Sequence, residues 1–285
     1  MIPYSLDIAM LRGVQPIIDL ALAEDLGTGD ITSATTIPAD VNSSAKLVVK
    51  ADGVIAGLPI ASLVMQTVDP AIIFRPLIND GLPVTRGEVL AEITGSVRSL
   101  LTAERTALNF LQRMSGIATV TAHYVQAVQG ISAHIVDTRK TLPGHRILDK
   151  YAVRAGGGSN HRFNLSDGVL IKDNHIAAVG GVAAAIAAAR AGAPHTLKIE
   201  IEVESLEMAQ HAVEAGADII MLDNMSNDDM RACVEMIAGR ALTEASGGIT
   251  IERVREIADI GVDLISVGAL THSVQALDIS LDLEA

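Results

Sequence analysis

Apolar and polar residues follow one repeated order through the second half of the chain. Short apolar runs that suit buried strands are each followed by a segment whose apolar positions recur at helical spacing. The runs expected as strands are residues 133–136, 168–171, 197–204, 218–222, 241–245 and 263–267. Six strand–helix units in succession predict parallel strands, arranged either as an α/β barrel or as a doubly wound sheet.

The first part of the chain has a different pattern. Residues 45–51 have the composition of a strand, Asp52-Gly53 is a hairpin turn signal, and residues 54–56 are the expected return strand. Further short strands and a helix are expected up to residue 94. We therefore expect a small α/β sandwich in this part.

A domain boundary is expected where the two patterns meet. Helical spacing predicts two helices there, over residues 99–116 and from Ile117 to about residue 128. We place the N-terminal α/β sandwich at residues 1–115 and the α/β barrel, with the active site, at residues 116–269. The C-terminal residues 270–285 are expected to pack back on the sandwich.

Polar residues at the expected strand ends favour the barrel over the open sheet. Active sites of α/β barrels form at the C-terminal ends of the strands, from residues of several strands. At these ends the sequence places Asp137-Thr138-Arg139-Lys140, Lys172, Glu202, Asp223, Ser246-Gly247-Gly248 and Gly268. A barrel brings these positions into one ring, whereas a doubly wound sheet scatters them along an edge.

Two of these loops carry a phosphate-binding signal. Ser246-Gly247-Gly248 and Ser266-Val267-Gly268 each place small residues before an expected helix. Glycine lets a ligand approach the backbone closely, and the N–H groups at a helix start attract anions. Because phosphate sites in barrels lie between the final two loops, we expect a phosphate here.

The distribution of charge indicates the kind of ligand. The chain has a formal net charge of -13, yet residues 137–175 contain seven Lys/Arg against four Asp. A positive island in an acidic chain is typical of a site for an anion, and the alternative is a solvated face with ordinary salt bridges. The acidic balance of the whole chain argues against nucleic acid, since phosphate contacts need clustered cations.

The remaining composition argues against several classes of protein. Cys233 is the single cysteine, so we expect neither a disulfide framework nor a cysteine metal site. Residues 1–13 lack the pattern of a secretory signal, and no run approaches the roughly 18 apolar residues of a membrane span. We expect a cytoplasmic protein that binds neither membrane nor nucleic acid.

Several motifs then follow one another along essentially the whole chain. They are ALAEDLGTGDITS, ERTALNFLQRMSGIAT, DTRKTLPGHR, GGGSNHR, LIKDNHI, IEIEVES, IIMLDNM, EASGGIT and ISVGALTHSVQALDISL. In this order they resemble the quinolinate phosphoribosyltransferase family. The resemblance implies an N-terminal α/β sandwich followed by an open, seven-stranded α/β barrel, in which residues 153–159 would supply the strand missing from the six above.

The resemblance also implies a reaction. The family joins quinolinate to phosphoribosyl pyrophosphate in the presence of Mg²⁺, and releases nicotinate mononucleotide, pyrophosphate and CO2 in de novo NAD biosynthesis. It implies a homodimer or a higher oligomer, in which Arg105 of one subunit completes the site of its neighbour.

Residue roles are carried over from the family motifs to the matching positions. The implied catalytic residues are Lys140, Glu202 and Asp223, and the last two would also hold Mg²⁺, largely through the bound pyrophosphate. The implied substrate-binding residues are Arg105, Thr138, Arg139, Lys140, His161, Arg162, Lys172, Glu202, Asp223, Ser246, Gly247, Gly248, Ser266, Val267 and Gly268. Two departures from the family pattern, at His145 and at Phe163-Asn164, do not touch these positions.

The residues alone leave some of these roles open. Glu200, Glu202 and Glu204 alternate with apolar residues, so all three share one face of a strand and only the resemblance selects Glu202. His161 could be a packed histidine without a ligand. Arg105 could form a surface salt bridge with Glu104.

Two other functions remain alternatives. Lys172 at a strand end is also the arrangement of a Schiff-base lyase of the aldolase type, although such a lyase would not need so many neighbouring cations. The second alternative is a repurposed relative without the transferase activity, such as the molybdenum-transport-associated homologues. The intact LIKDNH motif and the Glu202/Asp223 pair argue against it.

Overall fold

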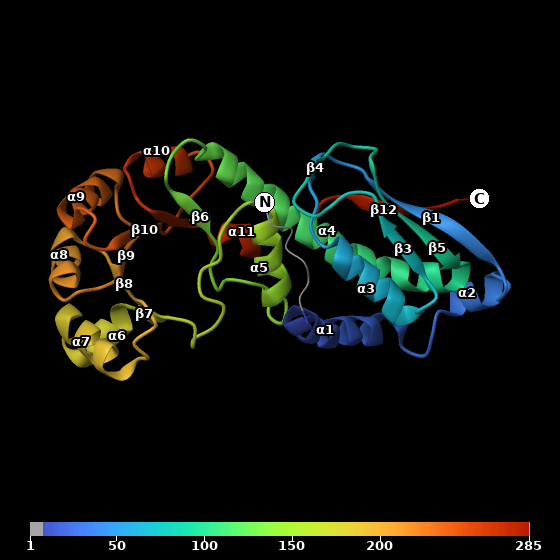
Figure 1. Cartoon of the computed structure of the whole chain (residues 1–285), viewed down its shortest axis with the longest axis horizontal. Helices are drawn as coiled ribbons and strands as arrows, with labels where there is room; N and C mark the ends of the chain where they lie inside the picture. Colours follow the sequence, from blue (N-terminus) through green and yellow to red (C-terminus); the bar gives the residue numbers. More distant parts are fainter. Residues whose placement is uncertain (1–7, 285) are drawn as a thin grey trace. The chain divides into compact units, whose positions relative to one another are not determined.

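The computed structural model describes residues 8–284, which divide into two compact units (Figure 1). The sandwich unit comprises the described residues up to Ala122, Thr141–Gly157, and the residues from Leu270 onward. The barrel unit comprises His123–Lys140 and Gly158–Ala269. Each unit is described by itself below.

A four-stranded antiparallel sheet forms the sandwich unit's β layer. Its strands, in spatial order, are β12 (Ile279–Leu283), β1 (Asn42–Val49), β5 (Val89–Ser96) and β3 (Ile73–Pro76). On β1 the buried residues are Ala45, Leu47 and Val49, which share one face because side chains alternate along a strand. Strand β12 pairs with β1 along its length, so residues 279–283 belong to this sheet.

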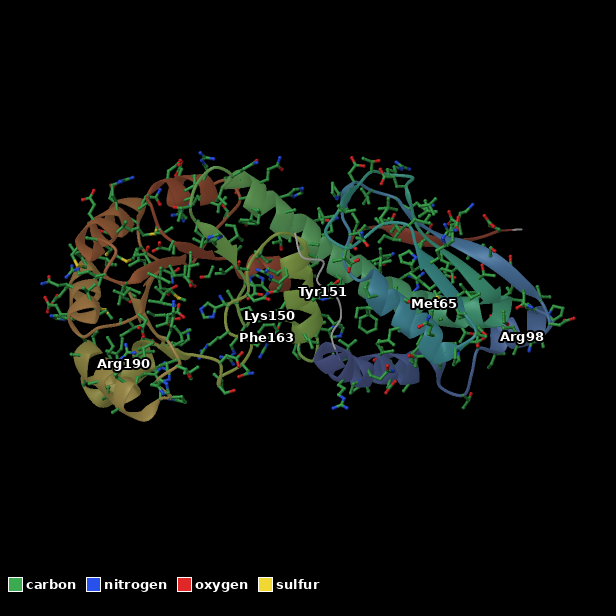
Figure 2. The ribbon with its side chains drawn as sticks, in the orientation of Figure 1. Met65, Arg98, Lys150, Tyr151, Phe163 and Arg190 are labelled. Atoms are coloured by element: carbon green, nitrogen blue, oxygen red, sulfur yellow. The ribbon has the colours of Figure 1, made fainter. Side chains whose placement is uncertain are left out.

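Helices and one short ladder complete the unit. The helices are α1 (Ile8–Leu26), α2 (Ile31–Thr36), α3 (Leu58–Val68), α4 (Val97–Ala127), α5 (Arg146–Ala155) and α11 (Ala269–His272). Strands β2 (Gly53–Val54) and β4 (Pro83–Val84) pair with each other. The half-buried Asp80 carboxylate joins two of the helices, because it accepts hydrogen bonds from the Gly57 N–H at 2.7 Å and from the Tyr151 hydroxyl at 2.7 Å. Tyr151 is labelled on α5 in Figure 2.

The hairpin expected at Asp52-Gly53 is wrong. Strand β1 pairs with β5 and β12, and Gly53–Val54 pairs instead with Pro83–Val84. The Asp52 carboxylate accepts the N–H of Arg86 at 2.8 Å, so this turn is closed by a residue far along the chain. A local turn signal cannot reveal pairing with a strand that is distant in sequence. Here β1 pairs with such strands and not with the residues directly after the turn.

The break expected between two helices at Gly116 is also wrong, since α4 runs unbroken from Val97 to Ala127. A Cβ on Gly116 would lie 2.2 Å from the carbonyl oxygen of Gln275. The glycine therefore permits close packing of another segment on the helix and does not end it.

Six parallel strands form the barrel unit's sheet. In spatial order they are β6 (His134–Val136), β11 (Leu264–Ser266), β10 (Leu242–Ser246), β9 (Ile219–Asp223), β8 (Ile199–Val203) and β7 (Val169–Ile171). The last strand in sequence, β11, pairs with the first, β6, so the strands curl round as in a barrel (Figure 1). The sheet stays open between β6 and β7, which confirms the open α/β barrel.

The expected seventh strand is reduced to a single bridge among the described residues. Ser159, in the segment expected to supply it, pairs in parallel with Val136 at the open edge of β6. The backbone N–H of Asp137 donates to the carbonyl oxygen of Ser159 at 3.1 Å. The segment after Gly158 thus begins where the missing strand would lie.

Outer helices follow the barrel strands. They are α6 (Asp173–Val179), α7 (Val182–Gly192), α8 (Leu206–Glu214), α9 (Asn227–Ile237) and α10 (Val254–Asp259). Ser205 and Ser226 cap α8 and α9 by accepting backbone N–H groups, as helix N-caps do. The helical segment expected after residues 168–171 is two helices, because Gly180 and Gly181 adopt φ of 86° and 139°.

No single helix of the described residues is both long and apolar enough to cross a membrane. Helices α6 and α7 reach that length and hydropathy only as a pair bent by 92°.

Candidate active site

A cavity of about 390 Å³ opens at the C-terminal ends of the barrel strands. Parallel strands end at the same edge of a barrel, so loops far apart in sequence meet here. The expected site residues that line the cavity are Thr138, Arg139, Lys140, His161, Arg162, Lys172, Glu202, Asp223, Ser246, Gly247, Gly248 and Ser266. Leu170, Met221, Asn224 and Glu244 also line it and were not expected.

Three expected residues are not part of this lining. Arg105 is exposed on α4 of the sandwich unit, and the alternative of a surface salt bridge with Glu104 is not found among the described residues. Val267 uses its N–H in the sheet, donating to the carbonyl oxygen of Val136 at 3.0 Å. Gly268 follows Val267 and leads into α11.

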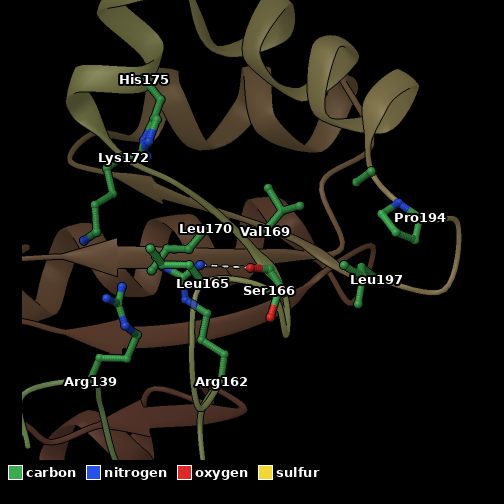
Figure 3. A pocket seen from close by; sticks show the side chains of 12 residues that line it. Arg139, Arg162, Leu165, Ser166, Val169, Leu170, Lys172, His175, Pro194 and Leu197 are labelled. Atoms are coloured by element: carbon green, nitrogen blue, oxygen red, sulfur yellow. Dashed lines mark hydrogen bonds between the residues drawn. The ribbon is translucent and has the colours of Figure 1, made fainter.

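Three cations gather where this cavity meets a second one of about 570 Å³ (Figure 3). The side chains of Arg139, Arg162 and Lys172 lie at one end of the second cavity, and apolar residues such as Val169 and Leu197 lie at the other. The Arg162 guanidinium is fixed by a hydrogen bond from Nη1 to the Gly168 carbonyl oxygen at 2.8 Å, drawn dashed in Figure 3. This end of the cavity is suited to a ligand that carries carboxylates.

The electrostatics of Arg162 are set by burial and by its neighbours. Burial and the positive charge of Arg139 lower the pKa of Arg162, while the carboxylates of Glu200 and Glu202 raise it. An arginine stays protonated under such shifts. The guanidiniums of Arg139 and Arg162 therefore repel each other, and an anionic ligand bound between them would reduce this repulsion.

Carboxylates line the same cavity as the cations. Glu202 is the penultimate residue of β8, and Asp223 ends the neighbouring strand β9. Glu202 forms an ion pair with Lys172, and the Asp223 carboxylate accepts the Asn224 side-chain amide at 2.7 Å. Two oxygen-bearing side chains on adjacent strand ends suit the hydroxyls of a sugar or a hard cation.

The glycine loop after β10 closes the far side of this cavity. Gly247 has a φ of +88°, and a Cβ there would lie 2.2 Å from the side-chain oxygen of Asn224. Gly248 has a φ of +59° and open space where a side chain would be. The hydrogen bonds of the described residues include none donated by the N–H of either glycine. Helix α10 begins only at Val254, so these N–H groups lie in a turn and not at the expected helix start.

Beneath the cations lies a buried cluster that the strand-end pattern did not reveal. The His161 Nε2 is 2.9 Å from Oε2 of Glu200 and 3.9 Å from Oε2 of Glu244. Glu244 is fully buried, and Glu200 is 4 % exposed. Glu244 lies in the middle of β10, two positions before the loop, where alternation alone would have placed it on the same face as Ser246.

Asp137 holds the backbone of the segment that carries His161. The buried Asp137 carboxylate accepts the His161 N–H at 2.9 Å and the Asn160 side-chain amide at 2.6 Å. Asp137 directly follows β6, so the segment is fastened to the end of that strand.

The expected Mg²⁺ ligands fit a metal held partly by substrate. Glu202 and Asp223 supply oxygen atoms, which Mg²⁺ prefers, and they line the same cavity. Among the described residues, the three groups close enough to hold an ion by themselves are His161, Glu200 and Glu244, and neither Glu202 nor Asp223 is one of them. Two carboxylates leave most of an octahedral shell to pyrophosphate and water.

An open parallel barrel with cations facing carboxylates and a glycine turn at its strand ends defines an α/β-barrel enzyme for anionic substrates. The family models for the N-terminal and C-terminal domains of quinolinate phosphoribosyl transferase match residues 30–115 and 117–282. The chain belongs to the quinolinate phosphoribosyltransferase family, which confirms the resemblance seen in its motifs.

Individual relatives agree with the family models. The chain is 46 % identical over 260 residues to the probable carboxylating nicotinate-nucleotide pyrophosphorylase of Bacillus subtilis, covering 91 % of this chain and 90 % of the relative. It is 48 % identical over 269 residues to the corresponding enzyme of Mycobacterium leprae, covering 92 % and 94 %. The crystal structure of NadC from Streptococcus pyogenes matches with a TM-score of 0.94 at 45 % identity, covering 98 % of this chain and 99 % of that one.

Proposed function

We propose that the chain transfers the phosphoribosyl group of phosphoribosyl pyrophosphate to the nitrogen of quinolinate, with loss of CO2. The products are nicotinate mononucleotide and pyrophosphate, a step towards NAD. The observation that carries this proposal is the match to both family domains over residues 30–282. Relatives that share 40 to 48 % identity over most of the chain carry names for this reaction.

In this proposal the cations bind the pyridine dicarboxylate. Arg139 and Arg162 offer planar guanidiniums that can bind a carboxylate through two parallel hydrogen bonds, whereas Lys140 and Lys172 act as point charges. All four line the cavity. A monocarboxylate would leave part of this positive charge without a partner, so the site should prefer quinolinate to nicotinate.

The other half of the cavity takes the phosphoribosyl group. Glu202 and Asp223 are placed to accept hydrogen bonds from the ribose hydroxyls. The turn at Ser246, Gly247 and Gly248 presents backbone N–H groups to the 5′-phosphate, and Ser266 lines the same side. Val267 is left out of this assignment, because its N–H is used by the sheet.

Mg²⁺ belongs to this proposal as a cofactor that enters with the phosphoribosyl pyrophosphate. Glu202 and Asp223 would hold it together with the pyrophosphate oxygens. When bound, it neutralises charge on the leaving pyrophosphate.

The residues of the chain act on the charges that develop during the reaction. As the bond to pyrophosphate breaks, the ribose carbon becomes positive, and the Glu202 and Asp223 carboxylates stabilise that charge. The pyridine nitrogen attacks this carbon and becomes a cationic pyridinium. The C–C bond to the neighbouring carboxylate then breaks, its electron pair stays on the ring carbon beside the positive nitrogen, and a proton replaces the released CO2.

Lys140 is the proposed catalytic cation. It is exposed and lines the cavity, and its backbone N–H is held by the Thr138 hydroxyl at 3.0 Å. Holding the loop lets the lysine ammonium stay near charge that shifts between the two substrates. The main contribution of the site is to hold the two reactants in register.

The proposal includes a homodimer. Arg105 does not line the cavity of its own barrel unit, and a partner subunit would have to bring it there. The proposal also keeps the cytoplasm as the location, in which the buried Cys233 would stay reduced.

Product formation tests the proposal. The purified protein, supplied with quinolinate, phosphoribosyl pyrophosphate and Mg²⁺, should form nicotinate mononucleotide, and leaving out any one of the three should abolish it. If no product forms with all three present, the proposal fails. A Schiff-base lyase is disfavoured because Glu202 engages the Lys172 amine that would have to attack a carbonyl carbon. If borohydride trapped a carbonyl substrate on Lys172, the Schiff-base lyase would be favoured instead.

A further inference from the structure

The buried cluster of His161, Glu200 and Glu244 lies under the cations and has no role in the proposal above. Glu200 comes from β8 and Glu244 from β10, whereas His161 lies on the segment that crosses the open side of the barrel. Their closest atoms lie within 4.8 Å of one another. A buried polar cluster of this kind needs a physical account, because unpaired buried charge is costly.

The hydrogen bonds of His161 define its tautomer. The backbone N–H of Arg162 donates to Nδ1 at 2.8 Å, so Nδ1 is an acceptor and carries no proton. The ring proton is therefore on Nε2, where it can donate to Oε2 of Glu200 at 2.9 Å. His161 is thus held as a neutral ring by two protein groups, one on each nitrogen.

This tautomer excludes the cluster as a metal site, although its spacing would otherwise fit one. A histidine that binds a metal through Nε2 carries its remaining proton on Nδ1 and donates it to a second group. Here Nδ1 instead accepts a hydrogen bond from the backbone N–H of Arg162. A metal on Nε2 would require an imidazole without any ring proton.

The segment around His161 is fastened at two separate places. Its backbone is held by Asp137 at the end of β6, through the His161 N–H. Its side chain reaches Glu200 on β8, on the other side of the gap between β6 and β7. Arg162 follows directly, so the placement of its guanidinium depends on these two attachments.

Glu244 differs from Glu200 in having no hydrogen bond to His161. Neither of its carboxyl oxygens, nor Oε1 of Glu200, has a hydrogen-bond partner among the described residues. Burial first, and then the negative charge of Glu200, raise the pKa of Glu244 to about 8. Glu202 raises that pKa further, and the nearby His161 offsets part of the rise. At neutral pH Glu244 is therefore the protonated acid of the cluster.

We propose that Glu200 and Glu244 are positioning residues for the dicarboxylate substrate, acting through His161 on the placement of Arg162. Glu200 accepts the His161 Nε2 proton and so spans the open side of the barrel. Glu244 fills the space beside them as an uncharged acid. This inference rests on the proposed function and names the substrate whose binding it controls.

A series at Glu200 separates positioning from simple electrostatics. Glu200→Leu removes the acceptor, and the KM for quinolinate should rise by about tenfold or more, while the KM for phosphoribosyl pyrophosphate stays within about twofold. Glu200→Gln keeps an oxygen that can accept the same proton, so it should recover most of the loss. Glu204→Gln removes an exposed charge from the same strand end and should change neither KM.

The direction in which the KM for quinolinate changes distinguishes positioning from a simple charge effect. The Glu200 carboxylate lies near a site for a dianion, so its removal would lower the KM for quinolinate if charge alone mattered. A lower KM in Glu200→Leu and Glu200→Gln overturns the proposal. An equal rise in both KM values, with a fall in Tm, also overturns it, because that pattern indicates general disorder of the barrel.

Glu244→Gln tests the neutral acid without relying on activity. The folded-state pKa of Glu244 lies above its unfolded value, so folding of the wild type is penalised progressively as pH rises from about 4.5 to about 8. The variant lacks this titration, and its Tm relative to wild type should increase over that range. In wild type, kcat/KM for quinolinate should fall above about pH 8 as Glu244 ionises, and the variant should lose that alkaline limb.

Three results would overturn the role proposed for Glu244 as a neutral acid. A Tm difference that stays constant or decreases with pH would show that Glu244 is charged in the folded protein. An unchanged alkaline limb would show that its ionisation does not reach the substrate site. One equivalent of Zn²⁺ or Mn²⁺ bound by wild type and lost in Glu244→Gln would make the cluster a metal site. If wild type forms no nicotinate mononucleotide, the proposed function fails instead, and the Tm profile still reports on Glu244.

Discussion

Arg162 carries much of the selectivity at the scale of single residues. Its guanidinium is fixed by the Gly168 carbonyl and lies beside Arg139 at the end of the cavity that suits carboxylates. Replacement by lysine keeps the charge and removes the planar fork. Arg162→Lys should raise the KM for quinolinate by roughly 10- to 100-fold, about 1.5–3 kcal/mol, and leave the KM for phosphoribosyl pyrophosphate nearly unchanged.

Steady-state kinetics with each substrate varied in turn measures this effect. Arg231→Lys is a matched control, because Arg231 forms an exposed pair with Asp228 on α9, and it should change neither KM. A rise confined to the KM for phosphoribosyl pyrophosphate would contradict the prediction, because Arg162 would then bind the phosphoribosyl donor and not the dicarboxylate.

Most of the cavity lining could be predicted at this scale, because one rule brings strand ends together. Lys172, Glu202 and Asp223 lie within one residue of the ends of their strands, so the barrel alone brings them to the cavity. Glu244 was missed because it precedes the end of its strand, and its importance comes from two partners on other segments. The N–H of Val267 could not be judged from sequence, since its partner belongs to β6.

At the scale of elements, α4 depends on a glycine in its middle. The carbonyl oxygen of Gln275 lies 2.2 Å from where a Cβ on Gly116 would be, so Gly116→Ala must displace backbone. We expect it to lower the free energy of unfolding by about 1–3 kcal/mol, against the usual helical preference for alanine. Chemical denaturation monitored by circular dichroism measures the change.

Gly192 provides the control for this prediction. It ends α7, and a Cβ there would meet nothing within 4 Å. Gly192→Ala should therefore be neutral, or stabilise by up to about 1 kcal/mol. If Gly116→Ala were equally harmless, Gln275 would not pack on α4 as described.

The elements were predictable where the signal repeats and not where it is local. Six strand–helix units in a row correctly predicted parallel strands, and the polar strand ends favoured a barrel. That the barrel is open was implied by the family resemblance. The Asp52-Gly53 turn and the glycine at residue 116 were misjudged, because each owes its role to a distant segment. The order of the antiparallel sheet, with β12 beside β1, joins the two ends of the chain and has no local signal.

At the scale of the whole molecule, the proposed dimer can be tested by mixing inactive variants. If Arg105 serves the neighbouring subunit, a mixed dimer of Arg105→Ala and Glu202→Ala contains one site in which both residues are intact. Random mixing of the two should restore roughly a quarter of wild-type activity, since half of the dimers are mixed and each has one such site. Mixed samples as inactive as either variant alone would place Arg105 outside the neighbouring site.

The central claim is that one cavity binds a dicarboxylate and a phosphoribosyl donor and couples their union to loss of CO2. The most direct measurement supplies quinolinate labelled in the carboxylate next to the ring nitrogen, with phosphoribosyl pyrophosphate and Mg²⁺, and counts all products. We predict equal amounts of nicotinate mononucleotide, pyrophosphate and labelled CO2, with negligible turnover of nicotinate. Nucleotide formed without CO2, or nicotinate used as readily as quinolinate, would contradict the account.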